Sequence, residues 1–251
     1  MKILSPESHQ RKIVRVLGLA QVLNGIGVAG TVAAGSLLVS SITKSDGLSG
    51  LAQTISVLGA AVMALPLARL TQSGGRRLAL TSGYSIGVVG AVLAIFGGAN
   101  QNLFFMLLGA FMVGAASASG YQARFAAIDL ATPEKRSKDL SFVVWGSTIG
   151  AVTGPNLMEP SGVFAAALGL PKLVGPYFIA AFTLALSVVV IQLFLKPDPF
   201  LTANKVAAGS SLQEQKSMRS ALKHIREYPL AIFAITSVAI GHLAMVSIMV
   251  M

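Results

Sequence analysis

The distribution of positive charge constrains the fold of this chain more than any other feature of its sequence. Basic side chains gather in every second gap between long apolar stretches, and the other gaps hold only Lys44 and Lys172. The gathered residues are Lys2, Arg11, Lys12, Arg15, Arg69, Arg76, Arg77, Arg124, Lys135, Arg136, Lys138, Lys196, Lys205, Lys216, Arg219, Lys223 and Arg226. Because positive charge is retained on the cytoplasmic side of a membrane, this alternation predicts a polytopic helical membrane protein whose N-terminus lies in the cytoplasm.

The composition agrees with a membrane protein. Charged residues make up 11% of the chain, whereas a soluble domain contains about 25%. The net charge of +10 would suggest nucleic acid in a soluble protein. Here the charge lies in loops that face anionic lipid headgroups, so we expect the lipid bilayer as a partner and no nucleic acid. The chain contains no Cys, which excludes disulfides and thiol chemistry.

Seven stretches have about the length of a membrane-spanning helix, which needs roughly 20 apolar residues. They are Val14–Val39, Gly50–Leu70, Leu78–Gly98, Leu103–Ile128, Leu140–Met158, Leu173–Leu195 and Leu230–Met251. Short turns rich in Gly, Asn and Ser separate the first pairs, and we expect a short interfacial turn around residues 160–162.

The segment of residues 196–228 is polar and basic, unlike the rest of the chain. We interpret it as a cytoplasmic linker, with an amphipathic helix at Leu212–Glu227 on the membrane surface. The chain then divides into a six-helix unit at residues 1–195, the linker, and a seventh helix at residues 229–251. This order predicts the first half of a two-half protein, whose missing C-terminal half is a partner. A genuine seven-helix protein is the alternative.

Two glycine motifs stand out between and within these stretches. Residues 68–77 read Ala-Arg-Leu-Thr-Gln-Ser-Gly-Gly-Arg-Arg, where Gly favours a tight turn and the Arg pair favours the cytoplasmic interface. In the fifth stretch, Gly146, Gly150 and Gly154 lie four residues apart, on one helix face that another helix can approach closely. Pro155 follows and is expected to bend that helix. An ordinary positive-inside turn and generic small-residue packing are the simpler interpretations.

The first motif resembles the loop signature G-x-x-x-D-R-x-G-R-R of the major facilitator superfamily. Gly75, Arg76 and Arg77 match its last three positions. Gln72 stands where the signature has Asp, so the acid that normally makes gating contacts is absent.

The second motif resembles G-x-x-x-G-P-x-x-G-G, a signature of the drug and metabolite efflux antiporters in that superfamily, through Gly150, Gly154 and Pro155. Residues 133–136, Pro-Glu-Lys-Arg, are similar to a loop element of the same proteins. The resemblance implies an all-α six-helix half-bundle, built as a 3+3 inverted repeat, plus a seventh membrane helix. It also implies alternating access around a midplane site. The fourth stretch departs from the antiporters, because it has no Arg near its start.

Polar residues inside the apolar stretches are candidates for the substrate pathway. Offsets of 3 and 10 residues place Gln21, Asn24 and Thr31 on one side of the first helix. Ser117, Tyr121 and Arg124 form a stripe on the fourth. The resemblance implies that these helices and the seventh line the central cavity. Hydrogen bonding between helices without substrate contact is the alternative.

Four ionisable groups are candidates for proton coupling or gating. Arg124 is a candidate partner for Asp129 at the inner mouth, or else extends its charge to the interface. Glu159 is expected at headgroup level, with a role in proton entry as the alternative. His242 lies about 18 Å into the last helix, near the midplane, where an ionisable group is a functional candidate. It either carries a proton or is a neutral, hydrogen-bonded histidine.

The expected function is secondary active transport across the cell membrane, by proton-coupled export of a small organic compound. An uptake permease for a small organic solute and an inactive fragment of a transporter are the alternatives. The sequence contains no HExxH motif, no phosphate-binding loop and no Cys/His cluster. We therefore expect no enzyme, no catalytic residues, no metal and no cofactor.

Overall fold

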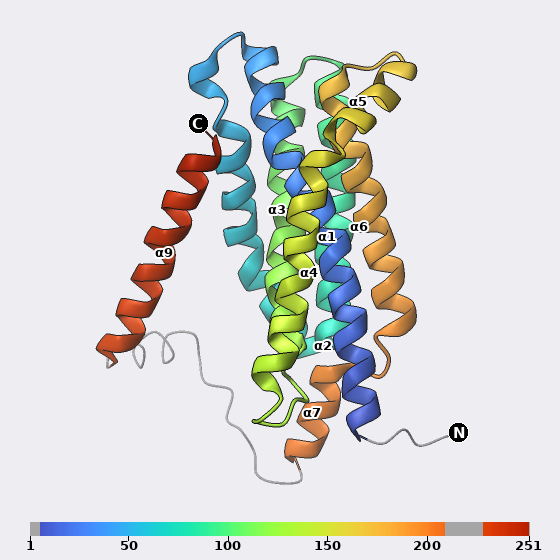
Figure 1. Ribbon diagram of the computed structural model, residues 1–251, viewed down its shortest axis with the longest axis vertical. Coiled ribbons are helices and arrows are strands. Elements are labelled where there is room, and N and C mark those ends of the chain that lie inside the picture. Colours follow the sequence, from blue (N-terminus) through green and yellow to red (C-terminus); the bar gives the residue numbers. More distant parts are fainter. Residues whose placement is uncertain (1–5, 209–227, 251) are drawn as a thin grey trace. The chain divides into compact units, whose positions relative to one another are not determined.

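The computed structural model describes residues 6–208 and 228–250, and all regular structure in these ranges is helical (Figure 1). The chain divides into two units, Met1–Asn204 and Lys205–Met251. The elements are α1 (Pro6–Thr43), η1 (Asp46–Leu48), α2 (Leu51–Ala99), α3 (Leu103–Ala126), α4 (Arg136–Asn156), α5 (Met158–Ala167), η2 (Lys172–Val174), α6 (Gly175–Phe194), α7 (Pro199–Ala208) and α9 (Pro229–Val250).

Within the described residues, four segments are long and apolar enough to cross a membrane, namely His9–Thr43, Asp46–Ala99, Leu103–Ala126 and Lys172–Asn204. This result supports a helical membrane protein. The predicted fifth and seventh spans correspond to α4 and α9. The first turns of α4 are polar, and they include Arg136, Lys138 and Asp139. Both spans, and with them the count of six helices plus one, stay predictions.

The helix α2 contains 49 residues and is broken once, at Gly75. Gly75 has φ 86° and ψ 173°, a backbone conformation that glycine adopts at little cost because it has no side chain. The break divides α2 into two limbs, residues 51–74 and 76–99. The tight glycine turn expected in this region is therefore a single residue, and the helix continues on both sides of it.

The two limbs of α2 run in opposite directions along α3. Contacts with the first limb proceed in the same direction on both helices, whereas contacts with the second limb proceed in opposite directions. The pairs that show this are Gly59 with Phe111 and Ala64 with Gln122 on the first limb, and Gly97 with Met106 and Gly87 with Ala116 on the second. Residues 51–99 are thus a helical hairpin packed against α3.

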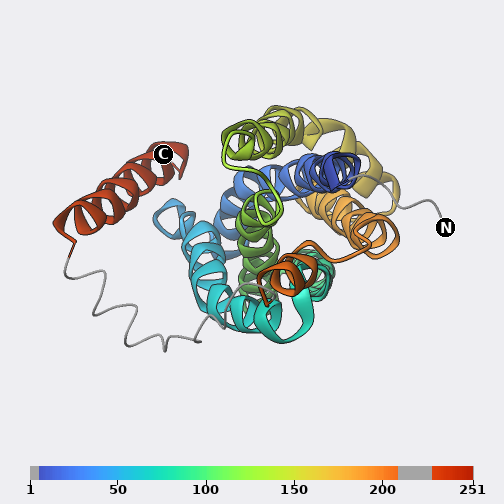
Figure 2. The ribbon, with the colours of Figure 1, turned by 90° about the horizontal axis from the view of Figure 1, so that it is seen from below.

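The remaining helices keep this alternation of direction. Along α1, Gly18 packs against Phe142 and Gly30 packs against Gly154, so α4 is parallel to α1. The helix α6 runs the opposite way to α1, since Gly27 lies beside Thr183 and Gly35 beside Tyr177. As a result, the start of α1, the turn of α2, the end of α3, the start of α4 and the end of α6 lie at one end of the first unit (Figures 1 and 2). We call this the basic end, because the predicted basic gaps of this unit meet there.

Glycine brings the backbones of α1 and α4 into contact. A methyl group on Gly150 would lie 2.5 Å from the Cα of Gly25, and one on Gly154 would lie 2.8 Å from the backbone nitrogen of Gly30. Gly146 approaches the carbonyl oxygen of Gly18 in the same way, at 2.8 Å. The glycine face predicted for the fifth stretch is therefore the face that packs against α1. We call this contact the glycine seam.

The structure differs from the predicted boundaries in three places. The first helix is longer than expected because α1 continues to Thr43, in the turn before η1. The expected turn at residues 160–162 lies inside α5, at the end opposite the basic end (Figure 1). The linker contains near its start a helix, α7, that is absent from the prediction. The amphipathic helix predicted at Leu212–Glu227 lies outside the described residues.

Candidate functional site: the basic end and the polar face

An ion pair joins the turn of α2 to the end of α3. The guanidinium of Arg76 donates from Nε to Oδ2 of Asp129 at 2.8 Å and from a terminal nitrogen to Oδ1 at 3.2 Å. Each side chain is 14% exposed. A planar guanidinium that binds both oxygens of a carboxylate fixes orientation as well as distance. The pair therefore holds two segments 53 residues apart in one arrangement.

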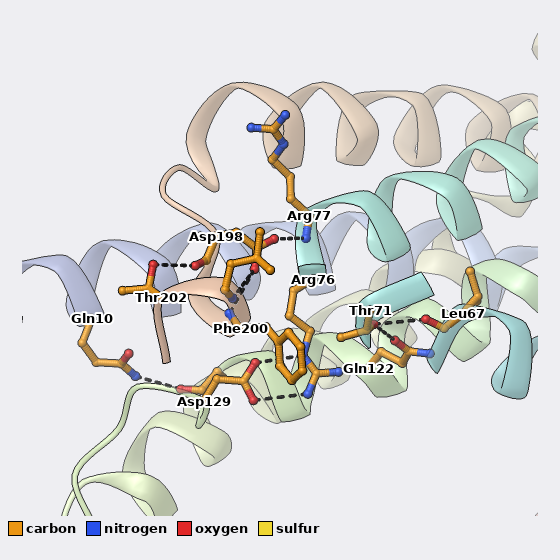
Figure 3. Close-up of polar contacts among 12 residues, drawn as sticks. Gln10, Leu67, Thr71, Arg76, Arg77, Gln122, Asp129, Asp198, Phe200 and Thr202 are labelled. Atoms are coloured by element: carbon orange, nitrogen blue, oxygen red, sulfur yellow. Dashed lines mark hydrogen bonds and ion pairs between the residues drawn. The ribbon is translucent and has the colours of Figure 1, made fainter. Parts of the chain in front are cut away.

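The first turn of α7 packs on the same pair (Figure 3). Oδ2 of Asp198 accepts a hydrogen bond from the backbone N–H of Arg77 at 2.7 Å. The ring of Phe200 lies beside the guanidinium of Arg76, whose central carbon is 5.7 Å from the ring centre. A cation over an aromatic face is attracted by the ring. The start of the linker is thus part of the basic end.

Glutamine side chains tie further elements to this end. Gln10 of α1 donates to the carbonyl of Ala127 at 2.8 Å and to Asp139 of α4 at 2.7 Å. Thr71 donates to the side chain of Gln122 at 3.1 Å, which links the first limb of α2 to α3. Together with the Arg76–Asp129 pair, these bonds connect α1, α2, α3 and α4 at a single end.

The loop between α3 and α4 carries the Pro-Glu-Lys-Arg element. Its acid, Glu134, accepts a hydrogen bond from its own backbone N–H and another from Thr132, and these bonds hold the pKa of its carboxyl below the ordinary value. The backbone carbonyl of Thr132 accepts from Lys135 and Arg136 as α4 begins. The element therefore forms the turn that starts α4, and its carboxylate is ionised at neutral pH.

The predicted polar residues of α1 face α3 near the middle of the bundle. Gln21 and Asn24 are buried, with exposed fractions of 2% and 6%. A methyl group on Gly120 of α3 would lie 2.5 Å from the amide nitrogen of Asn24. Within the described part of the chain, Oε1 of Gln21 and Oδ1 of Asn24 have no hydrogen-bond partner. Buried acceptors without donors are uncommon in folded proteins, so these two amides are suited to binding a polar ligand or water.

The stripe on α3 lies beside them. Tyr121 is 46% exposed, and the guanidinium carbon of Arg124 lies 5.0 Å from the centre of its ring. A terminal nitrogen of Arg124 is 3.4 Å from the hydroxyl of Ser147 on α4, and in the described structure its Nε is buried without a partner. Ser117 is half-buried one turn before Tyr121. We call Gln21, Asn24, Ser117, Tyr121, Arg124 and Ser147 the polar face.

The expected pairing of Arg124 with Asp129 is wrong. Both oxygens of Asp129 accept from Arg76, whereas Arg124 reaches Ser147 and the ring of Tyr121. The reason is geometric: Asp129 lies beyond the last turn of α3, where the loop turns toward the break in α2. Arg124 is thereby left on the polar face.

Thr31 lies apart from Gln21 and Asn24, farther from the basic end. Its hydroxyl donates to the carbonyl of Val28 at 2.8 Å. It borders a small recess with Gln53, Ser56 and Tyr177, and the hydroxyl of Tyr177 reaches the carbonyl of Thr31 at 3.4 Å. The structure thus divides the three predicted residues of α1 between two places.

The two remaining ionisable candidates lie away from the polar face. Glu159 is exposed in the first turn of α5, at the end opposite the basic end. His242 belongs to α9, and its side chain lies outside the part of the chain that the structure describes. Their roles in proton movement stay predictions, as do the transport roles of the polar face.

Comparison with known proteins gives the class of this chain. A family model described as the Major Facilitator Superfamily matches residues 17–251. The chain belongs to the major facilitator superfamily. Its resemblance to this superfamily in the loop motif and in the fifth stretch is therefore confirmed as family membership. Members of this superfamily are membrane transporters, and nothing in the comparisons points to an enzyme.

Several curated members of the superfamily are similar to the chain. It is 32% identical to YdeG of Bacillus subtilis (strain 168), named an uncharacterized MFS-type transporter, over 99% of this chain and 59% of YdeG. It is 29% identical to YddS of the same strain, over 88% of this chain and 51% of that protein. A riboflavin transporter, RfnT of Brucella anthropi, is 28% identical over 59% of this chain and 37% of RfnT. The chain spans about half the length of YdeG and of YddS.

Sequence reasoning missed several residues of this superfamily member that the structure brings together. Gln10, Gln122 and Ser147 lie in apolar or mixed stretches and carry no local signal of their partners. Asp198 does have a signal: it directly precedes Pro199, and Asp before Pro is typical of the start of a helix. That pattern indicates where α7 begins but carries no signal of its contact with α2.

Proposed function

We propose that this chain is part of a secondary active transporter of the cell membrane that exports a small organic compound in exchange for protons. The observation that carries this proposal is the glycine seam, since α4 packs on α1 through the glycines of the efflux-antiporter signature. Glycine lets the backbones of two membrane helices approach closely. A tightly packed helix pair of this kind suits alternating access, in which one helical bundle rocks against another around a fixed site.

The polar face supports a substrate that is planar and rich in hydrogen-bonding groups. Tyr121 and Arg124 present a ring and a guanidinium plane 5.0 Å apart, and such surfaces stack on flat aromatic molecules. The amides of Gln21 and Asn24 offer unpaired acceptors nearby. A relative of this chain is named a riboflavin transporter. We therefore propose small planar heterocyclic compounds as the substrate class, with riboflavin as the first probe.

Proton coupling is proposed on different grounds. His242 is the residue that we expect to carry the proton, because imidazole titrates near neutral pH and the sequence places it near the midplane of the last helix. The complete transporter is proposed to include a further set of helices after residue 251, which would close the central cavity. The basic end faces the cytoplasm in this proposal.

The test uses the complete protein, extended beyond residue 251, in liposomes of defined orientation. Riboflavin flux is measured by its fluorescence with an imposed pH gradient, with the gradient reversed and with the gradient collapsed by an ionophore. Proton-driven export predicts that riboflavin moves against its own concentration gradient. The direction of this flux should reverse when the pH gradient is reversed. Flux that is indifferent to the gradient contradicts proton coupling, and the absence of flux for a panel of planar compounds contradicts the substrate class.

Uptake of a small organic solute is the second candidate. A departure from the antiporter pattern favours it, because the first turns of α3 lack an Arg. Oriented vesicles separate the two candidates, because an uptake permease accumulates substrate toward the basic end. An inactive fragment is the third candidate. It predicts that the seven-helix chain alone moves no substrate, whereas the extended protein does.

A further inference from the structure

We infer that Asp198 is a positioning residue that supplies, from the linker, the acid that the α2 turn lacks. It caps two helices at once and so fixes α7 to the Arg76–Asp129 pair. The geometric part of this inference stands by itself, whereas its consequence for transport rests on the proposed function.

The two oxygens of Asp198 have different partners. Oδ1 accepts from the backbone N–H groups of Phe200 and Leu201, at 3.0 and 3.2 Å. Pro199 is the first residue of α7, so these N–H groups belong to its first turn. The N–H groups of a first turn have no carbonyl partner within the helix. Oδ1 therefore serves as the N-terminal cap of α7.

Oδ2 caps a second helix. It accepts from the N–H of Arg77 at 2.7 Å, and Arg77 lies in the first turn of the second limb of α2, just after the break at Gly75. That limb also begins with N–H groups that lack partners within the helix. A carboxylate at the N-termini of two helices is stabilised by the partial positive charge of both.

Gly75 makes room for this contact. A methyl group at Gly75 would lie 2.5 Å from Oδ2 and 2.7 Å from the carboxyl carbon of Asp198. The carboxylate thus packs directly on the Cα of the residue that breaks α2. The glycine of the loop motif is required here both for its positive φ and for the approach of Asp198.

The contact continues to the ion pair. Phe200, whose N–H is bonded to Asp198, places its ring beside the guanidinium of Arg76, and Arg76 binds Asp129. The side chain at position 72, where the family signature has its acid, is exposed on the last turn of the first limb. Asp198, which lies 121 residues after Arg77, therefore supplies an acid at this turn. Movement of the α2 turn is consequently coupled to movement of the first turn of α7.

The variant Asp198→Asn distinguishes the effects of the two caps. Asparagine is as good an N-terminal cap as aspartate, so its carbonyl oxygen can keep α7. Its NH₂ group then faces the N–H of Arg77, donor against donor. The predicted loss is confined to the turn of α2, which makes this variant sharper than Asp198→Ala, which removes both caps.

The experiment is amide hydrogen exchange, read by mass spectrometry on the present chain in detergent, over peptides that contain Arg77. We expect exchange at Arg77 to be faster by at least about tenfold in Asp198→Asn, because hydrogen bonds to charged groups are among the stronger ones, with peptides of α7 unchanged. Asp198→Ala should accelerate both regions. Asp46→Asn is the matched control, since Asp46 accepts from Ser40 at 2.6 Å at the opposite end. Unchanged exchange at Arg77 in Asp198→Asn overturns the inference.

The transport consequence is measured in the complete protein. Because Asp198 lies away from the polar face, Asp198→Asn should lower the maximal flux several-fold and leave the substrate KM unchanged. A changed KM with an unchanged maximal flux overturns its role as a positioning residue. If the parent protein moves no substrate, the proposed function fails while the exchange result at Arg77 still decides the cap.

Discussion

Arg76 and Asp129 form a two-point ion pair, with nitrogen–oxygen distances of 2.8 and 3.2 Å, that fastens the turn of α2 to the end of α3. Both side chains are largely buried, at 14% exposure. The pair lies where the helical hairpin of α2 reverses direction, so it ties the turn of the hairpin to the end of α3. Its removal is expected to affect stability first and transport second.

Asp129→Asn should destabilise the chain by roughly 1–3 kcal/mol, because it leaves the Arg76 guanidinium without its charged partner in a largely buried place. The melting temperature in detergent should fall by about 2–4 °C for each kcal/mol lost. Arg76→Lys should lose a similar amount, since an ammonium group cannot bind both oxygens in a plane. The double variant Arg76→Ala/Asp129→Ala should be less destabilised than the sum of the single variants. Strict additivity would show that the two residues do not interact.

Gly150→Ala should destabilise the glycine seam. The new methyl group would meet the backbone of Gly25 at 2.5 Å, and backbone atoms cannot rotate away as a side chain can, so α1 and α4 must separate. A loss of about 1–3 kcal/mol is expected from overpacking, again read from the melting temperature. Gly47→Ala is the control, because a methyl group there meets only the Ser45 hydroxyl, at 3.7 Å. Equal melting temperatures for both variants would contradict the packing described for the seam.

Tyr121 and Arg124 are predicted to bind substrate by stacking. Tyr121→Phe keeps the aromatic face and should leave the affinity of the complete protein for riboflavin within about twofold. Tyr121→Ala should weaken it by about 2- to 30-fold, the range that corresponds to a cation–π contact of about 0.5–2 kcal/mol. Quenching of riboflavin fluorescence on binding gives the dissociation constant directly. Equal affinities for Phe and Ala at position 121 would remove the ring from the site.

His242 is predicted to carry the transported proton. In the complete protein, His242→Gln should abolish the dependence of flux on pH in the range where imidazole titrates, around pH 6–7. Substrate binding at fixed pH should persist, because the polar face is intact. The measurement is counterflow, which needs no proton movement, alongside gradient-driven flux. Retention of both activity and the parental pH profile in this variant removes His242 from the proton pathway.

Much of the fold could be predicted from the sequence because membrane topology depends on local features, namely apolar stretches and the basic residues between them. The alternation of basic gaps predicted which helix ends lie together, and the bonds from Gln10, Arg76 and Asp198 join those ends in the structure. The turn at Gly75 followed from a Gly-Gly-Arg-Arg sequence. Glycines four residues apart predicted a close helix contact, though not that its partner is α1.

The pairing of side chains could not be predicted in the same way. Asp129 has Arg124 five residues before it and Arg76 far away in sequence, and only the fold shows that the distant one is its partner. The Pro-Ser-Gly sequence at residues 160–162 predicted a short turn, whereas these residues belong to the helix α5. The role of Asp198 depends on a contact between the linker and a turn formed 121 residues earlier. Such contacts depend on how the helices pack, for which a single sequence holds no local signal.

The basic end is proposed to lie on the cytoplasmic side of the membrane. The positions of the inner mouth and of the linker, and the direction of transport, all depend on this orientation. The chain has no Cys, so single cysteines report position without further changes. Ser73→Cys is at the exposed turn of α2, and Ser45→Cys lies in the short turn at the opposite end. In intact cells, a membrane-impermeant maleimide should label Ser45→Cys at once and should label Ser73→Cys only after the membrane is opened. Labelling of Ser73→Cys in intact cells, with Ser45→Cys protected, would contradict this orientation.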